Sequence, residues 1–229
     1  MSLLCYPQDP LDIWCQILMT EEELCKGIKE RIQADYGVEV DSNDVVQIPK
    51  LLESLSRLPH LLVRVCGIKS LGFKDQGVSK EYYPNHGYYV ADQLVLNTQL
   101  LDDPQVFIDH SGRTLDRFEH TLYHEMGHGF DEHQKDAALQ PDWLELSGWS
   151  KDPHPGLLRV TINEDGSPEL VGDWWYSPSA VFPRFYAKRS PWEDYADCFS
   201  FYVGGLKDFL PASKISYFDN VLKDYIEGL

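Results

Sequence analysis

Two histidines lie four positions apart in the segment His124-Glu125-Met126-Gly127-His128. On a helix, side chains at this spacing lie about one turn apart on the same side, so both imidazoles can reach one metal ion. Zinc accepts histidine nitrogen at about 2.0 Å, and a catalytic zinc site keeps one coordination position for water. The segment therefore predicts a Zn²⁺ site with His124 and His128 as ligands.

Glu125 follows the first of these histidines, where its carboxylate can reach a water molecule on the metal. A bound metal lowers the pKa of that water towards about 7, so a carboxylate suffices as the general base. These residue types predict hydrolysis of a peptide bond by metal-activated water. Two alternatives remain open: a metal-dependent amidase acting on a non-protein amide, and a zinc-stabilised binding module without catalysis.

A third ligand is harder to find near the motif. In a metzincin a glycine and a histidine would follow, but this chain has Asp131 and Gln134 at those positions. His133 is one position off and faces another way on a helix. His120 lies one turn before His124, but three positions spread over two turns of one helix cannot converge on a tetrahedral ion.

A carboxylate on a second helix is the other source of a ligand. Ser190 and Pro191 indicate a helix start, and Glu193 and Asp197 then lie four positions apart on one face. The residues alone leave two interpretations equal, because Ser190 and Glu193 also match a capping box.

Two blocks of the sequence resemble the zinc metallopeptidases related to the anthrax lethal factor catalytic domain and the bacterial Pro-Pro endopeptidases. They are LYHEMGHGFD, from Leu122 to Asp131, and FYAKRSPWEDYADCFSFYV, from Phe185 to Val203. The resemblance implies that Glu193 is the third zinc ligand and that Asp197 orients a ligand histidine. Asp197 stands where the family more often has glutamate, whose reach is longer.

The same resemblance implies two roles around the metal. Tyr186 would donate a hydrogen bond to the developing oxyanion. The segment Leu94, Val95, Leu96 and Asn97 is similar to the family's edge strand, on which an extended substrate would pair through its backbone. Aromatic residues between 174 and 185 are further candidates for the cleft wall: Trp174, Trp175, Tyr176, Phe182 and Phe185.

The elements expected from local patterns alternate between helix and strand. A capping box at Thr20 and Glu23 opens a helix that runs to about Tyr36 and ends at Gly37. Apolar spacing and turn residues predict the others: helices at 49–57, 115–131 (amphipathic), 191–206 and 213–226, strands at 60–68 and 88–97, and a hairpin across 163–167.

These elements predict an α+β fold, and the resemblance implies that it is of the zincin-like type. It would have a small, mostly antiparallel sheet, an active-site helix with the HExxH motif, and a C-terminal helix that bears the third ligand. Residues 1–60 are expected to form a helical N-terminal part packed on a metallopeptidase domain at 61–229.

The charge and composition of the chain limit the classes of partner and the compartment that we expect. The chain carries 37 acidic and 20 basic residues, a net charge of -17, which disfavours nucleic acid and anionic lipid. The same charge could attract a basic polypeptide substrate, or it could simply keep the surface strongly solvated. Apolar runs fall short of the roughly 20 residues that span a bilayer. The five cysteines form no CxxC pair, and the first residues lack signal-peptide features. We expect a reducing cytoplasm, or export by a route without a classical signal peptide.

Overall fold

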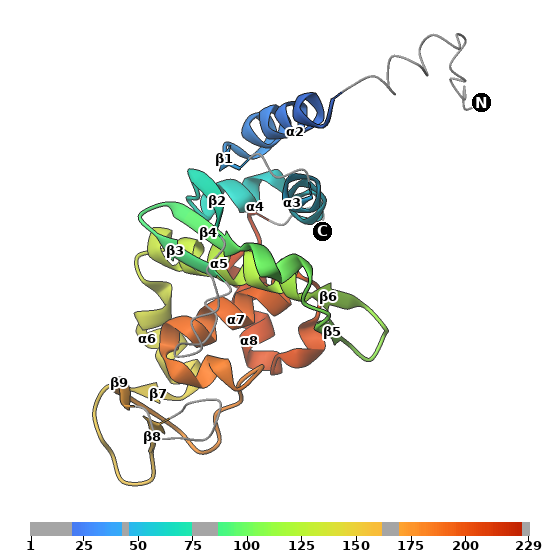
Figure 1. Ribbon diagram of the computed structural model, residues 1–229. Helices are drawn as coiled ribbons and strands as arrows, with labels where there is room; N and C mark the ends of the chain where they lie inside the picture. The colour runs from blue at the N-terminus through green and yellow to red at the C-terminus, as the bar shows by residue number, and fades with distance from the viewer. Residues whose placement is uncertain (1–19, 43–45, 75–86, 162–169, 226–229) are drawn as a thin grey trace, which may run out of the picture.

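The computed structural model describes residues 20–42, 46–74, 87–161 and 170–225, which form an α+β fold (Figure 1). The α-helices in these ranges are α2 Glu21–Tyr36, α3 Gln47–Ser56, α4 His60–Val65, α5 Arg117–His133, α6 Pro141–Ser147, α7 Pro191–Val203 and α8 Ala212–Val221. The strands are β1 Glu39–Asp41, β2 Ser70–Lys74, β3 Gly87–Val90, β4 Gln93–Asn97, β5 Val106–Ile108, β6 Thr114–Asp116, β7 Trp149–Ser150, β8 Leu158–Thr161 and β9 Leu170–Tyr176.

Helix α2 begins and ends where its capping residues predict. The Thr20 hydroxyl accepts from the Glu23 amide at 3.2 Å, and the Glu23 carboxylate accepts from the Thr20 amide at 2.8 Å. Gly37 ends the helix with φ of 78°, a left-handed conformation that glycine adopts without steric cost.

The predicted strand at 60–68 is wrong, because His60–Val65 forms helix α4. Leu62 and Cys66 are both fully buried, whereas Leu61 is 51% exposed, which is the spacing of one helical face. Arg64 also donates to the carbonyl of Asp35 at the end of α2. A short apolar run of this kind cannot be assigned to helix or strand by pattern alone.

The main sheet has the order β1-β2-β4-β3, and it is mixed rather than mostly antiparallel. The pairings β1-β2 and β2-β4 are parallel, and only β3-β4 is antiparallel. Parallel strands need a crossover, and between β1 and β2 the helices α3 and α4 supply it. The N-terminal part is therefore not only helical, since its strand β1 joins the sheet.

The predicted strand at 88–97 is in fact a hairpin of β3 and β4. Ala91 and Asp92 form its two-residue turn with φ of 48° and 64°. Positive φ at both central residues is the geometry that joins two antiparallel strands most tightly.

Helix α5 lies between the sheet and α7 (Figure 1). The predicted helix at 115–131 is confirmed as α5, but 13 of its 17 residues are buried, so it is a central helix buried well beyond one apolar face. A second cluster, built around Trp149 and Trp174, joins α6 to the β7-β9-β8 sheet. The strands β8 and β9 pair antiparallel as a hairpin would, and the predicted tip at 163–167 lies outside the described residues.

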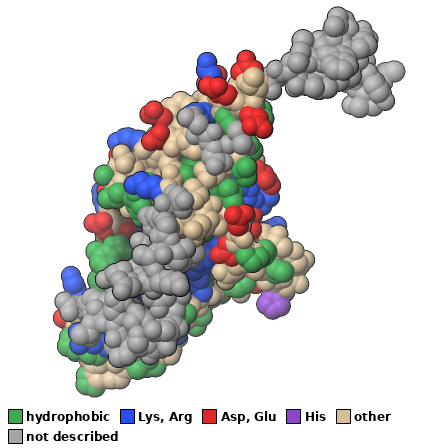
Figure 2. Space-filling model, in the orientation of Figure 1, with side chains coloured by type: hydrophobic (Ala, Val, Ile, Leu, Met, Phe, Trp, Pro, Cys, Tyr) green, Lys and Arg blue, Asp and Glu red, His purple; other side chains and the backbone are tan. Residues whose placement is uncertain are grey.

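The surface carries mixed charge. Figure 2 shows Asp and Glu side chains interspersed with Lys and Arg on the face it presents, with hydrophobic side chains between them. Within the described ranges, no helix combines the length and apolar character needed to cross a membrane. Cys25, Cys66 and Cys198 are free and buried, and Cys5 and Cys15 lie outside the described residues.

Candidate metal centre

Helices α5 and α7 approach closely enough to share one site because Gly127 has no side chain. A Cβ at Gly127 would stand 2.9 Å from the Cα of Ala196 and 3.2 Å from the Cβ of Phe199. Real Cβ atoms essentially never come within 3.0 Å of another such atom, so a side chain at 127 would require the helices to move apart. The close approach places the 124–128 side of α5 against the first turns of α7.

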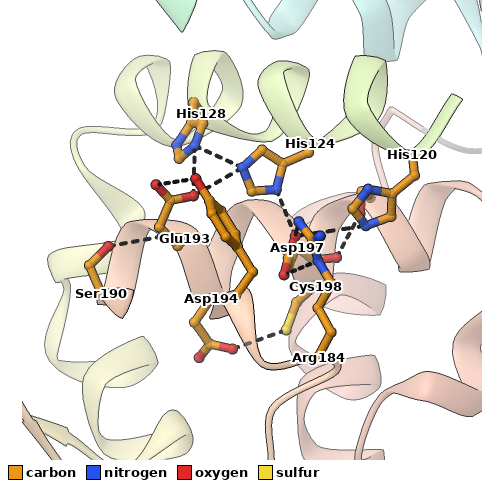
Figure 3. Close-up of polar contacts among 11 residues, drawn as sticks. His120, His124, His128, Arg184, Ser190, Glu193, Asp194, Asp197 and Cys198 are labelled. Carbon is orange, nitrogen blue, oxygen red and sulfur yellow. Dashed lines mark hydrogen bonds and ion pairs between the residues drawn. The ribbon is translucent and has the colours of Figure 1, made fainter. Parts of the chain in front are cut away.

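Three side chains from the two helices meet at this contact (Figure 3). The Nε2 atoms of His124 and His128 lie 3.2 Å apart. Oε2 of Glu193 is 3.0 Å from the first and 3.5 Å from the second. Ligand atoms of these three residues all lie within 4.8 Å of one another, so the group could hold a metal ion.

Glu193 forms only half of the capping box that the sequence left open. Its amide donates to the Ser190 hydroxyl at 3.2 Å, which caps the start of α7. Its carboxylate is free of that cap and faces the histidines of α5 (Figure 3). Capping at the backbone and a place at the candidate metal site are thus compatible in one residue.

Asp197, one turn further along α7, accepts a hydrogen bond from Nδ1 of His124 at 2.7 Å. The predicted contact forms despite the short side chain, because the close approach of the helices shortens the distance to be covered. Arg184 donates to both oxygens of the same carboxylate, with Nε to Oδ2 at 2.7 Å and Nη2 to Oδ1 at 2.6 Å. The Nδ1 bond leaves Nε2 of His124 to face Glu193.

The electrostatics of the site favour positive charge. Burial acts to lower the pKa of His124, but hydrogen bonds to Asp197 and Glu193 outweigh it and raise the pKa to about 10. Burial acts to raise the pKa of Glu193, but its hydrogen bonds to the two histidines hold that pKa well below its usual range. The carboxylates of Asp197 and Glu193 therefore stabilise positive charge at His124, and the same negative charge would stabilise a bound cation.

Glu125 and Tyr186 line the same cavity, whose volume is about 500 Å³. Burial raises the pKa of the Glu125 carboxyl, while the histidines act in the opposite direction. The Tyr186 hydroxyl donates to Oε1 of Glu193 at 3.3 Å, so it stands beside the group of three side chains. Burial raises the pKa of this phenol, so it stays a hydrogen-bond donor at neutral pH.

The segment Leu94–Asn97 is not an edge strand, which corrects the expectation from the sequence. It belongs to β4, which pairs with β2 on one side and with β3 on the other. No backbone edge of β4 remains for a substrate. Among the described strands of this sheet, β3 is the outer strand next to β4, and its residues Gly87, Tyr88 and Tyr89 line the cavity.

Gly87 brings this edge strand close to the site. A Cβ there would lie 3.1 Å from Cγ of Glu125. The Gly-Tyr-Tyr-Val run is a sequence signal for β3, but the single strand predicted at 88–97 runs through the tight turn at Ala91 and Asp92.

The other histidines of α5 lie outside the group. His133 is 40% exposed and contacts Asp92 at 3.2 Å. His120 is only 1% exposed, and its Nε2 is 3.7 Å from Asp197. It is therefore a buried neighbour of the site rather than a surface residue.

The predicted aromatic wall forms from other residues. The cavity is lined by Trp192 and by tyrosines of β3, together with Tyr186. Trp174 instead packs in the second cluster with Trp149, and Tyr176 and Phe182 pack against that cluster. Trp192 lies between the cavity and the second cluster, since it lines the cavity and its ring lies 5.8 Å from that of Trp174.

A buried ion pair fixes α7 against α8. Lys214 donates to both oxygens of Asp194, at 2.6 and 2.8 Å, and Trp149 donates to the same carboxylate at 3.2 Å. Both charged side chains are 1% exposed or less. Because Asp194 follows Glu193, this pair holds the first turn of α7 in place from the side away from the site.

Comparison with known proteins leaves the family open. No protein-family model matches the chain, and no curated protein matches it.

Proposed function

We propose that this protein is a zinc-dependent endopeptidase, with His124, His128 and Glu193 as metal ligands and Glu125 as the general base. The observation that carries the proposal is the convergence of three ligand atoms from two helices in a cavity that Glu125 and Tyr186 also line. The resemblance of the two sequence blocks to lethal factor-like metallopeptidases points to the same assignment.

The separations within the group support zinc. Bonds of about 2.0 Å in tetrahedral geometry imply distances of roughly 3.3 Å between ligand atoms. The three separations in this site are 3.0, 3.2 and 3.5 Å. Three protein ligands, two imidazoles and one carboxylate, also make up the donor set of an open catalytic zinc site rather than a closed structural one.

When bound, zinc would polarise the scissile carbonyl and acidify a water molecule. Glu125 would take the proton of that water and later pass it to the leaving amine. Tyr186 would donate its hydroxyl hydrogen to the oxygen that becomes negative as the carbonyl is attacked. Asp197 would hold His124 in the orientation that keeps Nε2 facing the site.

The proposed substrate is a polypeptide. An extended segment would pair with the outer edge of β3, which has no strand partner among the described residues, and main-chain hydrogen bonds would hold the peptide in register. The net charge of -17 favours basic segments, and Asp131, Glu132 and Asp136 on the cavity wall agree with that preference.

Cleavage-site profiling of a denatured proteome with zinc-loaded protein tests the proposal. We expect discrete peptide-bond cleavages that stop when zinc is removed and return when it is restored. Glu125→Gln should keep the fold and the zinc while turnover falls by at least about 100-fold, as loss of a general base predicts. Glu145→Gln, which changes an exposed carboxylate of α6, is the matched control. Near-normal turnover in Glu125→Gln would refute the mechanism.

A parallel assay on peptidoglycan crosslinks separates peptidase from amidase activity. Zinc binding without hydrolysis of either substrate would favour a binding module.

A further inference from the structure

Arg184 has no role in the mechanism above, yet its guanidinium makes a two-bond contact with a carboxylate of the site. It donates to both oxygens of Asp197, at 2.7 and 2.6 Å. The Asp197 side chain is fully buried and the Arg184 side chain is 20% exposed. A two-pronged contact of this kind fixes the plane of the carboxylate as well as its position.

The orientation of Asp197 matters because two histidines compete for it (Figure 3). Oδ1 accepts from Nδ1 of His124 at 2.7 Å and lies 3.7 Å from Nε2 of His120. That Nε2 is buried and has no hydrogen-bond partner among the described residues. A carboxylate free to rotate could turn towards His120 and lengthen its bond to His124.

Arg184 also contacts Tyr186. Its Cζ lies 4.8 Å from the centre of the tyrosine ring, within the range of a cation-π interaction. One guanidinium therefore touches both the carboxylate that orients His124 and the ring whose hydroxyl reaches Glu193.

We propose that Arg184 is a positioning residue that locks Asp197 onto His124 and holds the Tyr186 ring over the site. Its effect on the metal passes through Asp197, not through direct contact. The inference rests on the proposed zinc site. Zinc binding by the unaltered protein tests that site, and the ratio of variant to unaltered affinity tests the role of Arg184.

The experiment measures zinc dissociation constants by chelator competition for the full chain and for five variants, of which the fifth is Asp197→Asn alone. Arg184→Met removes the positive charge and both hydrogen bonds to Asp197, and we expect the zinc affinity to fall about 10- to 100-fold. Arg184→Lys keeps the charge but cannot bond both oxygens in a fixed plane, so it should restore only part of the affinity. Arg189→Met is the matched control, since its guanidinium lies 5.0 Å from the same tyrosine ring and its loss leaves the Arg184–Asp197 pair in place.

The fourth variant tests whether the effect passes through Asp197. In Arg184→Met/Asp197→Asn no unpaired charge is left buried, so the double variant should fold even where Arg184→Met does not. Its zinc affinity should match that of Asp197→Asn alone, because Arg184 has nothing left to orient. A further loss of affinity in the double variant would overturn the proposed route.

Absorption spectra of the cobalt-substituted proteins give a readout that stability alone would not move. The ligand-field bands should shift in Arg184→Met and stay unchanged in Arg189→Met. Unaltered zinc affinity and cobalt spectrum in Arg184→Met, with only a lower melting temperature, would overturn the positioning role. Failure of the unaltered protein to bind zinc would instead overturn the proposed function, and this inference with it.

Discussion

Gly127→Ala tests whether the close approach of α5 and α7 sets the metal site. The added Cβ would lie 2.9 Å from the Cα of Ala196, where ordinary contacts begin at 3.4 Å. Since the nearest atoms belong to a helix backbone, they cannot rotate away, and the helices must separate, by about 0.5 Å if ordinary contact is to be restored. His124 and His128 lie on one of these helices and Glu193 on the other.

The expected magnitude follows from the tolerance of metal geometry. Ligand positions in working sites lie within about 0.2 Å of their ideal distances, so a displacement of this size exceeds the tolerance. Overpacking of a tight contact costs about 1–3 kcal/mol. If that strain is relieved by separating the helices, zinc affinity should fall by roughly 5- to 150-fold.

Chelator competition measures the affinity, and thermal denaturation of the metal-free protein measures the stability. Gly27→Ala is the matched control, because a Cβ at this exposed position in α2 meets nothing within 4 Å. It should raise stability by about 1 kcal/mol through helix propensity and leave zinc affinity unchanged. Zinc affinity of Gly127→Ala within about threefold of the unaltered protein would refute the reasoning.

Three further predictions address single residues. Glu193→Ala should lose most of the zinc measured by metal analysis, because two histidines alone bind far more weakly. The control His133→Ala should keep its zinc. Full zinc occupancy in Glu193→Ala would remove Glu193 from the ligand set. Tyr186→Phe should lower kcat roughly ten- to a thousandfold with little change in KM, and steady-state kinetics that show unchanged turnover beside a lower melting temperature would exclude the catalytic role. Lys214→Met should destabilise the protein by about 3–5 kcal/mol, because it leaves Asp194 charged and unpaired in the interior, so the melting temperature should fall by roughly 6–20 °C. A shift of less than about 2 °C would show that the pair contributes little, and adding Asp194→Asn should recover part of the loss.

Local patterns predicted those elements whose ends carry their own signals. The capping box at Thr20 and the glycine at 37 bound α2 as expected, and Ser190 with Pro191 begins α7. Helix α7 ends at Val203, slightly before the predicted 206, and α8 spans Ala212–Val221 within the predicted 213–226 region except for its first residue. Capping groups act within one turn, so the chain alone specifies them.

Elements defined by long-range pairing were predicted less well. His60–Val65 forms a helix because its apolar residues pack at helical spacing into the core, and the pattern alone did not show which partner they meet. The sequence resemblance places the edge of the sheet at Leu94–Asn97, but β3 folds back and pairs with that strand. Which strand is an edge depends on pairing between distant segments, and a local pattern holds no information on that pairing.

By itself, the sequence determined which residues could carry chemistry: the paired histidines, Glu125 between them, and a downstream carboxylate at the start of a helix. Only the tertiary structure decided that Glu193 reaches the histidines, that Asp197 is close enough to orient His124, and that Arg184 holds Asp197 in place. The physical reason is the packing of α5 against α7. Spacing of three or four residues fixes neighbours on one helix, whereas contacts across 65 or more positions depend on how closely two helices approach, and here Gly127 sets that distance.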